Sequence, residues 1–111
     1  MEECRAEWIS WELQDYYKRP IRKLLLSIPD IEDLVKEYKH PHCTKRSFEP
    51  KLDWIIKHIL YLLFDESYTK IDDWYREPEW NILKHKENEF IKILDSIDDK
   101  VTEICKEDEN Y

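Results

Sequence analysis

The chain has 111 residues, of which 40% are charged and 41% hydrophobic, and its formal net charge is −8. It contains no glycine, the residue that supplies the positive φ angles of tight hairpin turns and of phosphate-binding loops. This composition argues against a β-rich fold, a dinucleotide-binding fold and a P-loop. The acidic balance argues against direct binding to nucleic acid or to an anionic membrane.

The N-terminal part of the chain has the apolar spacing of helices. Residues 3–18 carry apolar side chains every three to four positions, which predicts a helix. Pro20 interrupts this pattern, and because proline is tolerated in the first turn of a helix, either a second helix or a kinked continuation starts there. Apolar residues at i, i+3, i+4 and i+7 over 31–38 predict a short amphipathic helix, capped by Ser27 or Asp30.

Two longer helices are predicted in the second half of the chain. Residues 48–64, with Ser47 as the N-cap, are apolar on most sides, which is typical of a central helix. The last helix is expected over about 79–106 and has a heptad-like apolar seam that suits packing against a neighbouring helix. The seam consists of Phe90, Leu94, Ile97, Val101 and Ile104. We therefore expect one all-α domain over residues 1–111, a small four-helix bundle with room for extra short helices.

Membrane insertion and secretion are not expected from this sequence. The longest apolar run, residues 54–64, is interrupted by Lys57 and His58 and falls short of the ~20 residues that a membrane-spanning helix needs. No secretory signal pattern opens the sequence. The cysteines show no CxxC spacing, so we expect free thiols in a reducing cytoplasm, with one disulfide as the alternative. The cysteines are Cys4, Cys43 and Cys105.

A loop rich in histidine raises the question of a metal site. Residues 38–50, YKHPHCTKRSFEP, contain the zinc-ligand residue types His40, His42 and Cys43. Further candidate ligands elsewhere in the chain are His58, His85, Cys4 and Cys105. A structural zinc site usually has paired ligands in both halves, and one half is missing here. We therefore expect a polar connection between helices, with no metal and no cofactor, and keep the three loop residues as the alternative metal ligands.

No catalytic signature is present in the sequence. Cys43 lies beside His42, but adjacency in sequence rarely places a nucleophile and its base correctly. The adjacent carboxylates Asp72 and Asp73 have the residue type for acid–base work, yet adjacent acids on a solvated turn are common. We therefore expect that the protein is not an enzyme.

The segment 64–80, FDESYTKIDDWYREPEW, combines negative charge with aromatic residues. Six acidic side chains against two basic ones leave a charge of −4. Tyrosine and tryptophan are favoured anchors of protein interfaces, and surrounding carboxylates complement a basic cleft. The alternative is that Trp74 and Trp80 pack onto the bundle while the acids face water. The predicted partner-binding residues are Asp65, Glu66, Tyr68, Asp72, Asp73, Trp74, Tyr75 and Glu77.

Three stretches of this sequence resemble colicin D-type immunity proteins, small acidic helical bundles that protect a bacterium from its own tRNA-cleaving toxin. These stretches are YYKRPIRKLLLSIPDIEDLVKEY, IIKHILYLLFDESYTKIDDWYREPEW and ENEFIKILDSI. The chain departs from that family in being longer and in lacking glycine-containing turns. The resemblance implies a toxin whose basic active site is plugged by carboxylates. The matching acidic positions are Asp65, Glu66, Asp72, Asp73 and Glu77.

The expected function is therefore that of a cytoplasmic, non-enzymatic inhibitor of a basic protein, with a nuclease toxin as the expected partner. Two alternatives stay open. The first is a viral or phage accessory protein that antagonises a host defence system. The second is a self-associating helical protein that dimerises through the seam of residues 90–104. The sequence leaves open whether the protein is a monomer or a homodimer.

Overall fold

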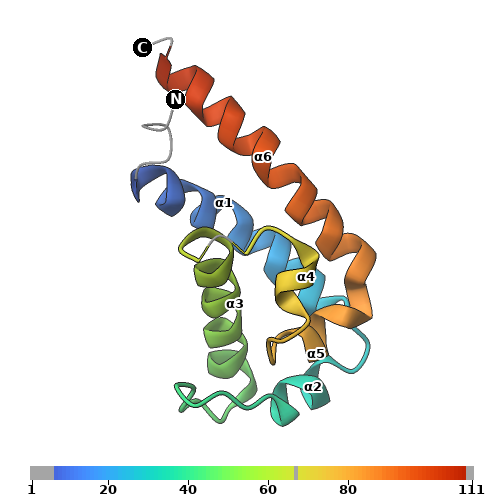
Figure 1. Cartoon of the computed structure of the whole chain (residues 1–111). Coiled ribbons are helices and arrows are strands. Elements are labelled where there is room, and N and C mark those ends of the chain that lie inside the picture. The colour runs from blue at the N-terminus through green and yellow to red at the C-terminus, as the bar shows by residue number, and fades with distance from the viewer. Residues whose placement is uncertain (1–6, 67, 110–111) are drawn as a thin grey trace.

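The computed structural model describes the backbone of residues 7–66 and 68–109 and the side chains of 11–66, 68–97 and 99–103. Within these residues the chain forms helices and no strand (Figure 1). The helices of seven or more residues are α1 Glu7–Leu26, α2 Ile31–Glu37, α3 Phe48–Phe64 and α6 Glu87–Glu109. The shorter ones are α4 Ile71–Trp74, α5 Trp80–Leu83 and the 3-10 helix η2 Lys84–Lys86. The predicted all-α fold, with four main helices and extra short ones, is confirmed.

Helix α1 continues through Pro20 instead of ending before it. Proline in a helix interior is unfavourable by about 3 kcal/mol. Burial of the side chains that follow offsets this penalty, because Ile21 and Leu25 are fully buried and each buried aliphatic side chain contributes about 1.5–3 kcal/mol. Of the two predicted outcomes at Pro20, the separate second helix does not form, and the first helix continues through the proline.

Helix α3, predicted to be central, contributes a large share of the core. Apolar side chains on most of its sides are buried, and α1 and α2 both pack against it. The buried apolar residues are Leu52, Ile55, Ile56, Ile59, Leu60, Leu62 and Leu63. Ser47 and Asp30 occupy the N-cap positions of α3 and α2, but neither makes a side-chain capping hydrogen bond. Ser27 does not cap α2 either, since its hydroxyl donates to the carbonyl of Leu24.

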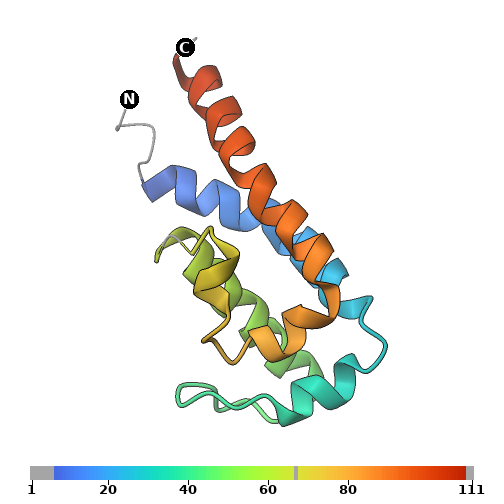
Figure 2. The same ribbon diagram turned by 45° about the vertical axis from the view of Figure 1, so that its right-hand side comes forward.

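The last predicted helix is divided in the structure. The chain turns through α5 and η2 before α6 begins at Glu87. Helix α6 packs against α1, and α1 contacts α3 as well, so α1 is shared by both (Figure 2). The described seam residues Phe90, Leu94, Ile97 and Val101 are buried in this chain's own core. These four side chains are therefore covered within the chain itself, and the alternative of a homodimer through residues 90–104 stays a prediction.

A few of the predicted features fall outside the described part of the chain. The side chains of Cys4, Cys105 and Ile104 lie there. Cys43 is described and is a free cysteine. Among the described residues, no helix combines the length and the apolar character that would let it cross a bilayer.

One hydrogen bond joins α1 to α6. The Tyr17 hydroxyl lies 2.7 Å from Ser96 Oγ. Because Ser96 Oγ already donates to the carbonyl of Ile93 at 2.8 Å, Tyr17 is the donor. We expect Tyr17→Phe to lower the free energy of unfolding by about 1 kcal/mol, the usual net value of such a bond. Urea titration measures this change, and the exposed Tyr16 supplies the matched control. An equal effect of Tyr16→Phe would contradict the assignment.

Candidate functional site

The acidic segment follows directly from the end of α3. The backbone N–H of Asp65 donates to the carbonyl of Tyr61, and that of Tyr68 donates to the carbonyl of Leu62. These bonds turn the chain back toward the bundle before α4 begins at Ile71. The turn keeps the charged residues on the outside. The exposed acidic side chains of this segment are Asp65, Glu66, Asp72 and Asp73.

Three carboxylates of this segment act on one phenol. The negative charge of Glu77 raises the pKa of Tyr68, followed by burial and a hydrogen bond to the same carboxylate, and Glu66 and Asp73 raise this pKa further. Tyr68 therefore lies within the electrostatic field of these three predicted residues. We call the group formed by Asp65, Glu66, Tyr68, Asp72, Asp73, Tyr75 and Glu77 the acidic surface.

Trp74 does not belong to the acidic surface. Its side chain is 0% exposed, its ring meets the Phe90 ring edge-on at 5.0 Å, and its Nε1–H donates to the carbonyl of Tyr68 at 2.9 Å. The prediction that Trp74 contacts a partner is therefore corrected, because α4 turns this side chain into the core. Tyr75, the next residue, is 52% exposed and keeps its place as a predicted contact.

Tyr61 is an exposed aromatic residue beside the acidic surface that the sequence reasoning missed. Its hydroxyl donates to Glu66 Oε1 at 2.7 Å, and its side chain is 43% exposed. The residue lies in the apolar run of α3, where a hydrophobic pattern assigns it to the core. Its hydroxyl and its helical spacing of four residues from Lys57 and eight from Asp53 indicated that it faces water.

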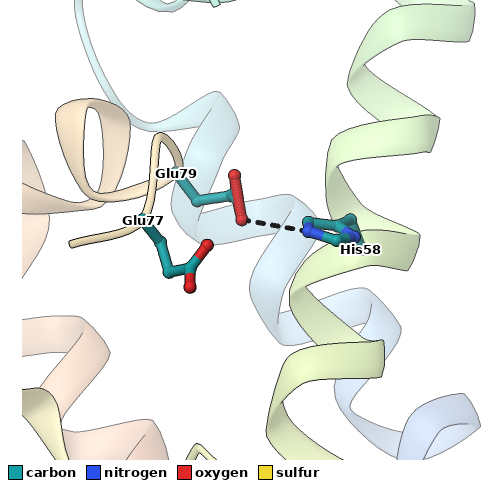
Figure 3. A group of neighbouring side chains, drawn as sticks. All are labelled: His58, Glu77 and Glu79. Atoms are coloured by element: carbon teal, nitrogen blue, oxygen red, sulfur yellow. Dashed lines mark ion pairs between the residues drawn. The ribbon is translucent and has the colours of Figure 1, made fainter. Parts of the chain in front are cut away.

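A second polar cluster lies at the opposite end of the same segment. Glu79 is fully buried, and its Oε2 accepts a hydrogen bond of 2.8 Å from the Tyr38 hydroxyl. Its Oε1 lies 3.4 Å from His58 Nε2 on α3 (Figure 3). A buried carboxylate normally has partners for both oxygens. Within the described residues, Glu79 Oε1 accepts no hydrogen bond.

Burial sets the protonation of this cluster. It raises the pKa of Glu79 to about 7, against the lowering effect of the hydrogen bond from Tyr38. Burial also lowers the pKa of His58, and the neighbouring His40 and His42 lower it further. The pKa of Tyr38 is raised far above its usual range by burial and by the charge of Glu79. At neutral pH, Tyr38 is thus a hydrogen-bond donor and His58 is largely an uncharged imidazole.

The histidine loop contacts this cluster from one side. The His40 ring meets the His58 ring edge-on at 4.6 Å, and His42 lies 5.5 Å from His40, measured between ring centroids. Within the described part of the chain, one group of potential metal ligands lies close enough together to hold an ion. It consists of His58, Glu77 and Glu79. The alternative metal ligands His40, His42 and Cys43 are not members of it.

The sequence carried little signal for Glu79. An acid between Pro78 and Trp80 has the pattern of a solvent-exposed residue in the first turn of a helix, where acids are favoured. His58 offered more, because it interrupts the apolar run of α3. The comparison of this sequence with family models, curated proteins and solved structures gives no match.

Proposed function

We propose that this protein is a non-enzymatic inhibitor that binds a basic protein, of which a nuclease toxin is the expected example. The exposure of Asp65, Glu66, Asp72 and Asp73 on one segment, together with the 52% exposed Tyr75, carries the proposal. Exposed carboxylates beside an exposed aromatic side chain complement a basic cleft in charge and supply contact area. The resemblance to colicin D-type immunity proteins adds to this, since their carboxylates match positions on the acidic surface.

The inhibitor acts by occupation of a cleft in this proposal. Asp72 and Asp73 stand in the first turn of α4 and are exposed, so both can reach a partner. The half-exposed Tyr75 follows them directly. In a nuclease partner, lysine and arginine side chains bind the phosphate backbone of the substrate. In the complex, these side chains would pair with Asp72 and Asp73. We place this action in the cytoplasm, where the cysteines stay reduced.

Charge reversal at Asp72 and Asp73 tests the proposal. We expect the double variant Asp72→Lys, Asp73→Lys to bind a basic partner at least tenfold more weakly, because attraction becomes like-charge repulsion. The partner is captured from lysate of the source organism at low and moderate salt and identified by mass spectrometry. Its affinity is then measured by calorimetry with purified protein, and helical circular dichroism verifies the fold of the variant.

The chain offers a matched control for this experiment. Glu32 and Asp33 are exposed and also stand in the first turn of a helix, α2, so Glu32→Lys, Asp33→Lys makes the same change in net charge. We expect this control to keep its affinity within about threefold, since distant exposed charges are screened. Equal losses of affinity in both variants would mean that the net charge of the protein, and not the position of Asp72 and Asp73, determines binding. Unchanged affinity in the first variant would remove the acidic surface from consideration. Identification of a host defence nuclease as the partner would favour the accessory protein of a virus or phage.

A further inference from the structure

The second polar cluster has a feature that the inhibitor function does not use. Glu79 is 0% exposed, yet its Oε1 has no hydrogen-bond donor among the described residues. An oxygen of this kind loses its hydration on folding and gains no hydrogen bond in return. Figure 3 shows that Oε1 is directed toward His58, with the Glu77 carboxylate beside the same space. A group that binds all three side chains would satisfy the buried oxygen.

The distances fit a small cation. A ring nitrogen of His58, a carboxylate oxygen of Glu77 and one of Glu79 all lie within 4.8 Å of one another. Tetrahedral zinc with bonds of about 2.0–2.1 Å keeps neighbouring ligand atoms roughly 3.3 Å apart, and His58 Nε2 lies 3.4 Å from Glu79 Oε1. These two ligands therefore already have the required spacing. Glu77 is half-buried at a turn, so rotation of its side chain can bring its oxygen closer.

The surrounding residues hold two of the ligands in position. Tyr38 donates to Glu79 Oε2, which leaves Oε1 turned toward His58. Trp54 stacks on the His58 ring at 5.0 Å with an interplanar angle of 19°, and Tyr61 stacks on it at 6.0 Å with the same angle. A hydrogen bond that orients a ligating carboxylate, like that of Tyr38, is typical of metal sites.

We propose that His58, Glu77 and Glu79 form a binding site for a divalent transition-metal ion of the zinc class. His58 binds through Nε2, Glu79 through Oε1 and Glu77 through one carboxylate oxygen, and water completes a tetrahedral set. Two carboxylates balance the charge of the dication, and imidazole with carboxylate is a ligand combination that zinc accepts. The bound ion links α3 to the turn before α5. The site shares Glu77 with the acidic surface, but its test does not depend on the inhibitor proposal.

Metal titration of the untagged full chain tests the site. After treatment with a chelator and its removal, zinc chloride is titrated by calorimetry, and cobalt(II) is titrated by visible absorption. We expect one ion per chain, a higher melting temperature and the absorption bands of tetrahedral cobalt without a thiolate charge-transfer band. His58→Gln and Glu79→Gln should each weaken binding tenfold or more. Tyr38→Phe, which removes the orienting hydrogen bond, should weaken it about ten- to hundredfold.

Matched controls decide between this site and adventitious binding. His85→Gln and Glu87→Gln change exposed residues outside the group and should leave zinc affinity unchanged. Near-ultraviolet circular dichroism shows whether the variants of buried residues fold. If they do not, Glu77→Gln, at a half-buried position, still tests the site. The proposal is overturned by an absence of binding, by unchanged affinity in the folded variants, or by a thiolate band. Loss of zinc on replacement of His42 and Cys43, with retention in Glu77→Gln, would also overturn it and move the site to the loop.

Discussion

Replacement of Trp74 by alanine is expected to lower the free energy of unfolding by about 3–5 kcal/mol, the usual range for loss of a large buried aromatic side chain. Trp74 is fully buried and contacts Phe90 and Tyr68 through its ring. Its Nε1–H also satisfies the carbonyl of Tyr68. The variant therefore loses apolar burial and a hydrogen bond at once, and it leaves a cavity between α4 and α6.

Denaturant unfolding followed by circular dichroism measures this loss, and Trp11 provides the control. Trp11 is 74% exposed, so Trp11→Ala should change stability by no more than about 0.5 kcal/mol. Similar small effects of both substitutions would mean that Trp74 faces water, and the original expectation of a partner contact would return. The experiment thus decides between a core residue and an interface residue at this position.

Glu79→Gln is expected to make the protein less sensitive to pH. Glutamine keeps an acceptor for the Tyr38 hydroxyl and carries no charge. In the wild type, burial raises the pKa of Glu79 from 4.5 to about 7. Each unit of pKa difference corresponds to 1.36 kcal/mol. The free energy of unfolding of the wild type should therefore fall by ~3 kcal/mol relative to that of the variant between about pH 4.5 and pH 7. Above that range, the difference should become constant.

The sign follows from the protons that each state binds. Between pH 4.5 and 7 the folded wild type keeps the Glu79 proton while the unfolded chain has released it, so rising pH favours unfolding. His58 has a lowered pKa and contributes the opposite slope below pH 6.5, and His40, His42, Glu77 and Tyr38 also face the cluster. Subtraction of the variant's unfolding free energy removes the contributions that the two proteins share. The measurement is made with a chelator present, and a difference that does not vary with pH would contradict the expectation.

The local patterns of the sequence predicted most of the fold. Helix α3 forms where continuous apolar spacing placed it, and α2 ends within one residue of its predicted end. Pro20 shows where local rules stop, because α1 continues through it while Ile21 and Leu25 beyond it are buried in the finished core. The division between η2 and α6 likewise had no local signal, since residues 84–90 contain neither proline nor glycine.

The candidate sites were predictable to different extents. The exposure of acids such as Asp72 and Asp73 could be predicted from their charge alone, because a carboxylate without a partner stays in water. Trp74 could not be assigned, since its burial depends on Phe90, which comes sixteen positions later in the sequence. The partners of Glu79 are equally remote, with Tyr38 at a separation of 41 residues. Contacts over such distances depend on how the helices pack, and local sequence patterns do not reveal that packing.

Glu77 connects the two proposals. Its carboxylate acts on Tyr68 in the acidic surface and also belongs to the group with His58 and Glu79. A bound dication would neutralise part of the charge that Glu77 presents to a basic partner. Zinc should therefore weaken partner binding if both proposals hold, and Glu77→Gln should abolish that effect of zinc.

The pairing of α1 with α6 also has a consequence for synthesis on the ribosome. Tyr17 and Ser96 meet in the folded protein but are separated by 79 residues. At about 5–20 residues per second, roughly 4–16 s pass between the synthesis of the two. Helix α3 emerges during this interval and can cover one side of α1, while the side that packs against α6 stays uncovered. The time for which the nascent chain exposes apolar surface there is set by the position of α6 in the sequence, and a more stable native state would not shorten it.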